Sequence, residues 1–333
     1  MAATLKCDTI QNASSSTANL TLDASGNATV GNTLVMGSSF KRNRIINGDM
    51  RIAQRGTTYN PSGYYQYGSV DRWSSTSNAS NTIAQSTDAP TGFKNSCSIS
   101  ATSAAYPGIA QRIESVNCTD LVGQTITISA YVKKTTGTTT VDVALYYANS
   151  ADNFGAITLI GAQTSLAPTP TSTWTRYSIQ FTNLPAGAAN GLQLSIFTSS
   201  GSTSDVWLIT GVQLEVGSVA TPYERQIYSD QLLQCQRYYN STGGLRFACA
   251  ASSTTRITAT LPLSAPLRTT PSLTMNLNQA RKYDAVAVTV TGATFSVAAL
   301  SNSAIDIHIS SLTSITDDAV YSVSITAKLD AEL

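Results

Sequence analysis

The chain has 333 residues, enough for two or three packed domains, and 42% of them are hydrophobic, which is enough to fill real cores. Only 12% are charged, about half of the roughly 25% typical of soluble proteins, whereas Ser and Thr together number 89 and Glu only four, a profile that excludes a helical bundle, a coiled coil and a charge-rich disordered chain. The net charge of +1 offers no basic surface, so no nucleic-acid partner is predicted.

Residues 1–40 are small and polar, and residues 19–31 predict two short strands around a turn. Leu20 and Leu22 alternate with polar neighbours, and residues 25–27 (Ser-Gly-Asn) supply the turn. Because such strands bury too little surface alone, we expect a docking or oligomerisation segment that pairs with another chain. The alternative is an N-terminal tail without stable structure.

Residues 41–70 form a basic and aromatic connector. Five of the twenty basic residues of the chain fall within residues 41–56. A phosphate-bearing partner is one explanation. We favour the other, in which these arginines hydrogen-bond carbonyls and carboxylates at a domain boundary.

Aromatic side chains concentrate at the end of this connector, in a stretch that Pro61 and Gly63 predict to be a loop. Exposed aromatic rings stack on sugar faces and anchor protein interfaces. The candidate ligand or receptor contacts are Tyr64, Tyr65, Tyr67 and Trp73. The favoured alternative is that these rings cover the end of the β domain that follows.

Residues 71–224 show strand patterns throughout. Apolar residues alternate with polar ones over residues 126–132, 141–147, 175–181 and 192–196, and residues 206–209 begin a nearly continuous apolar run typical of a central strand. Turn residues separate these runs. The spacing predicts a two-sheet antiparallel sandwich or jelly roll.

Residues 225–242 contain the one convincing helical pattern, with Ser229 and Asp230 as predicted capping residues. It is predicted to connect two domains. From 243 to 333 strand patterns resume and predict a smaller β-sandwich of about six strands, a candidate receptor-binding tip. The clearest of these strands are residues 256–261, 273–277, 285–290, 305–309 and 320–326. The fold class is therefore all-β, with a single short helix.

The sequence offers little for catalysis. The single histidine, His308, alternates with isoleucines on a predicted strand, beside Asp306, and is interpreted as a surface residue. No nucleophile elbow, phosphate-binding loop or zinc-protease motif occurs. The aspartates lie mostly in turn contexts, where Asp is common anyway, although a carboxylate pair for glycoside cleavage stays open. We predict no enzyme, no catalytic residue and no cofactor.

The cysteine spacing and the hydropathy pattern predict neither a metal site nor a membrane-spanning segment. The five cysteines are scattered without a C-x-x-C pair, so no metal site is predicted, and they are expected to be reduced thiols. Residues 1–10 lack the apolar stretch of a signal peptide, and no 18-residue apolar run exists. No membrane insertion is therefore expected.

Two segments carry a resemblance to a known group of proteins. The first is RIINGDMRIAQRG at residues 44–56 with VDRW at 70–73, and the second is GVQLEVGSVATPYE at 211–224 with CQRYY at 235–239. Together they resemble tail-fibre and related virion appendage proteins of tailed bacteriophages. In that group the two segments bracket a jelly roll similar to carbohydrate-binding modules.

The resemblance covers roughly residues 44–240 and concerns the scaffold rather than any particular ligand. It implies an elongated homotrimer on a virion, assembled in the host cytoplasm, that contacts other tail, baseplate or head proteins through its N-terminus. It further implies a non-enzymatic tail fibre or receptor-binding protein that recognises a host surface glycan or protein. It also suggests that Glu215 and Arg112 pair inside the sandwich.

The alternatives are a capsid decoration, a head fibre or a baseplate connector. Less favoured is a carbohydrate-active tailspike or accessory module, because the long right-handed β-helix of a tailspike has no counterpart in this sequence.

Overall fold

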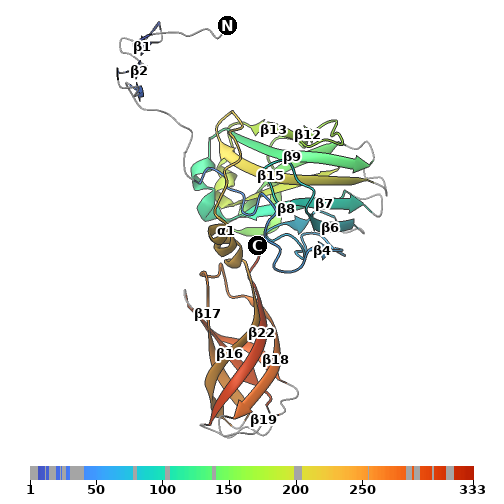
Figure 1. Ribbon diagram of the computed structural model, residues 1–333, viewed down its shortest axis with the longest axis vertical. Coiled ribbons are helices and arrows are strands. Elements are labelled where there is room, and N and C mark those ends of the chain that lie inside the picture. Colours follow the sequence, from blue (N-terminus) through green and yellow to red (C-terminus); the bar gives the residue numbers. More distant parts are fainter. Residues whose placement is uncertain are drawn as a thin grey trace. The chain divides into compact units, whose positions relative to one another are not determined.

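The computed structural model describes residues 7–11, 13–14, 20–22, 24, 28–30, 41–77, 81–101, 106–136, 140–198, 205–253, 255–282, 287–288, 293–301, 304–312 and 319–333. Nearly all regular structure is antiparallel β, with one α-helix among these residues, which confirms the predicted fold class (Figure 1). The chain divides into two compact units, Met1–Arg42 and Asn43–Leu333. The finer division into five parts stays a prediction.

The first unit contains a small antiparallel sheet. Its strands are β1 (Thr9–Ile10), β2 (Leu20–Leu22) and β3 (Ala28–Val30), in the order β1-β2-β3. The predicted strand pair is confirmed, with Leu20 opposite Val30, although the turn at residues 25–27 lies outside the described residues. Ile10 and Leu22 are exposed, as expected for strands too short to enclose a core.

Two six-stranded sheets form the β-sandwich of the second unit. One has the order β13-β9-β15-β7-β6-β4, the other the order β11-β10-β14-β8-β5, with β12 also paired to β10. The strands of the first sheet are β4 (Thr58–Tyr59), β6 (Asn81–Ser86), β7 (Ser96–Ala101), β9 (Ile126–Thr136), β13 (Thr175–Phe181) and β15 (Val206–Val216). Those of the second are β5 (Ser74–Ser75), β8 (Gly108–Ile113), β10 (Val141–Ser150), β11 (Asn153–Leu159), β12 (Thr164–Ala167) and β14 (Leu192–Thr198).

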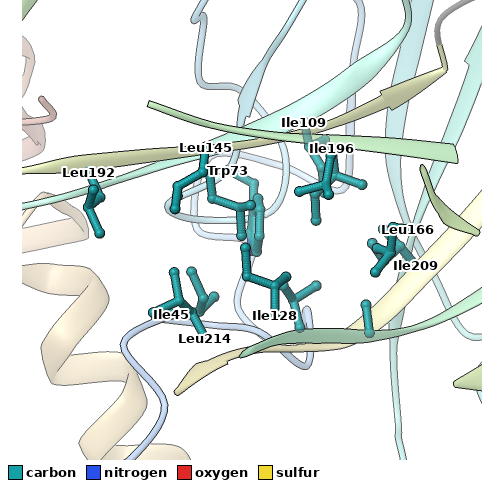
Figure 2. Close-up of a cluster of buried hydrophobic side chains, with 14 of the residues drawn as sticks. Ile45, Trp73, Ile109, Ile128, Leu145, Leu166, Leu192, Ile196, Ile209 and Leu214 are labelled. Atoms are coloured by element: carbon teal, nitrogen blue, oxygen red, sulfur yellow. The ribbon is translucent and has the colours of Figure 1, made fainter. Parts of the chain in front are cut away.

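The alternation seen in the sequence places one face of each sheet in the sandwich core. Ile128 and Ile209 come from the first sheet, and Leu145 and Ile196 from the second, all 0% exposed. Trp73 lies among them in the cluster drawn in Figure 2. The predicted central strand is confirmed, because β15 lies between β9 and β7 and is buried along almost its whole length.

Short helices connect these strands. Three 3₁₀ helices, η1 (Ser115–Asn117), η2 (Thr119–Leu121) and η3 (Ala186–Asn190), lie in loops of the sandwich. Helix α1 runs over Tyr228–Gln236, so the predicted helix is confirmed. Its N-cap is Ile227 without a side-chain cap, and the predicted capping role of Ser229 and Asp230 is wrong, since both lie in the first turn. Among the described residues, no helix combines the length and the hydropathy needed to cross a membrane.

The C-terminal part is one seven-stranded sheet with the order β19-β18-β22-β16-β17-β21-β20. Its strands are β16 (Tyr239–Ser253), β17 (Arg256–Pro262), β18 (Ser272–Lys282), β19 (Ala287–Val288), β20 (Thr294–Leu300), β21 (Ala304–Ser310) and β22 (Val320–Asp330). The sequence analysis assigned the first residues of β16 to the helical connector.

The long strand β16 lets this sheet enclose its own core. It pairs with β22 over most of its length and with β17 near its end, so it belongs to both halves of the sheet. Ile257, Ile307 and Val323 from the two halves pack in one buried cluster. The predicted second β-body is therefore present, built by one curled sheet.

Candidate functional site

The four aromatic candidates lie in three different environments. Tyr64 is 56% exposed, and its ring centroid is 6.2 Å from that of Tyr65. Tyr67 is half-buried, and the guanidinium carbon of Arg55 lies 5.4 Å from the centroid of the Tyr67 ring. Burial raises the pKa of the Tyr67 phenol. The structure therefore brings Tyr64 and Tyr65 together and places Tyr67 in a separate contact.

Trp73 belongs to the core of the sandwich. It is 1% exposed, and its indole Nε1 donates a hydrogen bond to the carbonyl oxygen of Asn47 at 3.1 Å. A ligand at the surface cannot reach a ring that is buried to this extent. The expectation that Trp73 contacts a ligand is therefore corrected, since its apolar surface is used for packing.

Tyr65 covers the outer face of the sheet that contains β8 and β14. Its hydroxyl accepts a hydrogen bond from Gln193 Nε2 at 3.1 Å, and the Arg112 guanidinium lies 4.5 Å from its ring centroid. Arg112 also lies 5.0 Å from the Phe154 ring and accounts for a second aromatic contact. These contacts favour the covering role, so that only Tyr64 of the four presents most of its ring to solvent.

The basic segment holds carboxylates and carbonyls, as the favoured interpretation predicted. Arg44 pairs with Asp120, Arg51 pairs with Asp49 at 2.5 Å and donates to the carbonyl of Gln226, and Arg55 pairs with Asp330 at 3.0 Å. These contacts lie within the chain. The predicted bonding of these arginines to carbonyls and carboxylates is confirmed, and the domain boundary stays a prediction.

A group of ion pairs and stacked side chains lies between the sandwich and the C-terminal sheet, and we call it the joint. Arg72 is 1% exposed, pairs with Glu332, and stacks with its guanidinium carbon 3.4 Å from the Tyr238 ring centroid. Burial opposes its charge, yet the Glu332 carboxylate raises the pKa of Arg72 above its usual value. Arg237 completes the joint through two hydrogen bonds to the Glu114 carboxylate, at 3.0 and 3.1 Å.

All four glutamates of the chain are held in structural hydrogen bonds. Glu114 and Glu332 belong to the joint, and Glu224 accepts from the backbone N–H of Asn43 at 2.8 Å. Glu215 is 1% exposed and accepts from Thr221 and Gln213. The expected pairing of Glu215 with Arg112 is wrong, because Arg112 donates instead to the Gln193 side chain and to the carbonyl of Leu333.

Asp306 and His308 are the remaining candidates for catalysis. Asp306 and His308 share the outer face of β21, opposite the buried isoleucines, as predicted, and Asp306 accepts a hydrogen bond from Thr260 at 2.6 Å. In the described part of the chain, no group of three or more His, Cys, Asp or Glu side chains could hold a metal ion.

The sequence did not reveal a cleft at one edge of the sandwich, which we call the edge cleft. It has a volume of about 590 Å³ and lies between the β11–β12 region of one sheet and the end of β13 in the other. Its lining residues are Tyr147, Thr158, Leu159, Ile160, Gly161, Ala162, Thr164, Ile179, Gln180, Phe181, Thr182, Asn183 and Pro185. The available signal was the tyrosine that ends the alternating run of β10, which suited a core residue equally well.

Comparison with known proteins gives similarities to solved structures alone. No protein-family model and no curated protein matches this sequence. A sugar-binding protein of Bacteroides thetaiotaomicron, titled as putative, is 16% identical, with 53% of this chain and 100% of that chain covered and a TM-score of 0.38.

Two further structures match at similar levels. The enzymatically active domain of tailspike protein 4 of bacteriophage CBA120 is 17% identical, with 53% of this chain and 21% of that chain covered and a TM-score of 0.37. The xylan-binding domain CBM22-2 of Paenibacillus barcinonensis Xyn10C is 14% identical, with 48% and 98% covered and a TM-score of 0.34. At these levels the similarities carry no conclusion about ligand or activity.

Proposed function

We propose that this protein is a non-enzymatic component of a bacteriophage virion, a tail fibre or receptor-binding protein that attaches the particle to a host surface glycan or protein. It is assembled in the host cytoplasm and acts as a homotrimer. The observation that carries the proposal is the way in which the two segments of the resemblance, 44–56 with 70–73 and 211–224 with 235–239, fit together.

These segments lie far apart in the sequence and hydrogen-bond directly to one another. The Arg44 N–H donates to the carbonyl of Leu214 at 2.9 Å, and the Val212 N–H donates to the carbonyl of Gly48 at 2.9 Å. Gly48 also fits against Val212, where a Cβ would come 2.2 Å from the carbonyl oxygen. Shared residues at these positions thus have a structural reason, which supports membership of one scaffold group.

The same two segments supply most of the joint to the C-terminal sheet. Arg55 and Arg72 come from the first, and Arg237 and Tyr238 from the second. An attachment protein has to transmit the position of a receptor-contacting domain to the particle, and a joint of buried ion pairs suits this task. All four glutamates accept hydrogen bonds within the fold, so a carboxylate pair for glycoside cleavage would have to come from the aspartates.

The small N-terminal sheet supports docking to other virion proteins or to copies of the chain. Its exposed Ile10 and Leu22, at 49% and 38%, need a partner surface to become buried. Light scattering of the full chain and of a chain lacking residues 1–40 tests this part. A mass of three chains that falls after truncation is expected, and a monomer in both cases would contradict the trimer.

The attachment role is tested on particles from the cells that produce this protein. Antibodies against residues 243–333 are expected to label the tail or its fibres in electron micrographs and to reduce adsorption. Labelling of the head alone would instead indicate a decoration protein or head fibre. Incubation with host capsule or lipopolysaccharide is expected to release no new reducing ends, and their appearance would indicate an enzyme.

A further inference from the structure

The edge cleft exists because the edge of β10 is covered by two short strands rather than one long strand. β12 pairs with residues 141–143 of β10, and β11 pairs with residues 146–150. The last hydrogen bond of this part of the edge runs from the Ile160 N–H to the carbonyl of Leu145, at 2.8 Å. The chain then leaves the sheet and turns at Gly161, where φ is +68°. The interruption opens the space between the two sheets.

The opposite wall is the end of β13, the edge strand of the other sheet. β13 pairs with β9 on one side and lies at the end of the strand order. Ile179 points toward the sandwich interior but stays half-buried, and Leu159 on the facing side is 36% exposed. Apolar surface that the sandwich would otherwise enclose is therefore available to a ligand.

Tyr147 is one of the residues that line the cleft, and its side chain also packs against the sandwich core. The ring packs on Gly187 in η3, where a Cβ would lie 2.3 Å from the nearest ring carbon. Only glycine permits this approach, so the ring is held in place before any ligand arrives. A pre-positioned aromatic ring can pack against the C–H face of a sugar with little further loss of conformational entropy.

The polar groups around the cleft are all uncharged. Its lining contains no Asp, Glu, Lys, Arg or His, while hydroxyl and amide groups come from Thr164, Thr182 and Asn183. Two further lining residues are already engaged, because the Thr158 hydroxyl donates to Asn149 and the Gln180 amide donates to the carbonyl of Ser218. Hydroxyls and amides both donate and accept hydrogen bonds, as the hydroxyls of a sugar do. A charged ligand would lose hydration here without an opposite charge to replace it.

We infer that the edge cleft binds a short uncharged saccharide, the C–H face of one ring packing near Tyr147 and its hydroxyls bonding to the threonine and amide groups. The volume falls within the range of about 300–1,000 Å³ that is usual for small-ligand sites. This inference rests on the proposed attachment function, for which it names the class of receptor. Three weak sites on a trimer would add up to firm attachment.

The test compares two substitutions of exposed alanines near the same edge. Ala162 lines the cleft, whereas Ala156 on β11 is exposed outside it, so Ala162→Trp fills the cleft and Ala156→Trp serves as the matched control. The probes are an array of neutral and acidic oligosaccharides, followed by calorimetry with the best neutral disaccharide and with sialyllactose beside lactose. Equal melting temperatures of the two variants establish that both are folded.

The wild-type chain and Ala156→Trp are expected to bind at least one neutral glycan, and Ala162→Trp to bind it about tenfold more weakly or not at all. Tyr147→Ser, a second variant, is expected to weaken binding in the same way. Failure of every neutral glycan on the array, equal binding by Ala162→Trp, or a preference for acidic glycans overturns the inference. If the purified protein nevertheless blocks adsorption, and Ala162→Trp blocks it equally well, the attachment function stands and the edge cleft is not its site.

Discussion

The sandwich with its joint and the C-terminal sheet are stabilised in different ways. The sandwich buries many polar side chains, among them Gln111, Gln193, Gln213 and Glu215, each with hydrogen-bond partners. In the C-terminal strands β17, β18, β20, β21 and β22, the buried residues that the structure describes are all hydrophobic. Buried hydrogen bonds are directional, so they allow only one arrangement of the side chains that form them. Alternating apolar residues specify which face of a strand is buried, but not which residues that face packs against.

Part of this difference lies in the segments that resemble virion appendage proteins. The buried polar or charged side chains from these segments are Asn47, Asp49, Asp71, Arg72, Gln213 and Glu215. The C-terminal sheet can vary on its outer face and loops as long as its inward positions stay apolar.

The largest expected effect is at the joint. Arg72→Ala removes one partner of a buried ion pair and leaves Glu332 with Arg55 alone, so the free energy of unfolding should fall by about 3–5 kcal/mol. Denaturant unfolding measures this loss. Arg246→Ala, on an exposed position of β16, is the control and should change stability by less than about 0.5 kcal/mol. A loss at Arg72 no larger than at Arg246 would show that the joint adds nothing to stability.

The C-terminal sheet should respond to the loss of apolar volume. Ile307 is 0% exposed between Ala259 and Val297, and Ile307→Ala should cost about 2–5 kcal/mol, with Ile307→Val costing about 0.5–1.5 kcal/mol. Ser296→Ala, at an exposed position of β20, should be nearly neutral in the same unfolding measurement. A large effect at Ser296 would mean that the outer face is specified as strictly as the inner one.

A smaller effect is expected where the two resemblance segments touch. Gly48→Ala would place a Cβ 2.2 Å from the carbonyl oxygen of Val212, so the two backbones must move apart at a cost of about 1–3 kcal/mol. Gly155→Ala on β11 is the matched control, because its Cβ would meet only the Asn153 side chain, at 3.1 Å. Equal thermal stability of the two variants would contradict the close fit between the segments.

The sequence predicted those parts of the fold that depend on alternation. The all-β class, the central position of β15 and the outward position of His308 follow from period-2 patterns, which the structure confirms. The N-cap of α1 was predicted two or three residues too late, because Ser and Asp suit the first turn of a helix as well as its cap. The first residues of β16 were assigned to the helical connector because they follow the helix without a break.

The sites were less predictable, because they depend on which residues meet. An aromatic run can face solvent or the core, and only tertiary packing separates Tyr64 from Trp73. The edge cleft depends on an interruption between two strands, and no local pattern distinguishes it from an ordinary loop. The role of the basic segment was predicted correctly. Residues 41–56 contain only one acidic residue, Asp49, so most of their arginines had to find partners elsewhere in the chain.

The smallest effect is expected at an exposed ion pair that belongs neither to the joint nor to the buried polar side chains of the sandwich. Lys133 Nζ lies 2.5 Å from Asp88, which also accepts a hydrogen bond from Trp174 Nε1 at 3.0 Å. The hydrogen bonds from Lys133 and Trp174 lower the pKa of Asp88. The contribution of Asp88 is therefore present above its unfolded-state pKa and is lost as the pH falls through its lowered folded-state pKa.

Asp88→Asn should accordingly cost less than about 1 kcal/mol at neutral pH, because water screens an exposed pair, and the difference from wild type should vanish in acid. Paired unfolding curves across the acid range measure this difference. A cost as large as that of Arg72→Ala, or one that grows in acid, would contradict the distinction between buried and exposed charge pairs. The comparison of these two substitutions thus isolates burial as the property that gives the joint its strength.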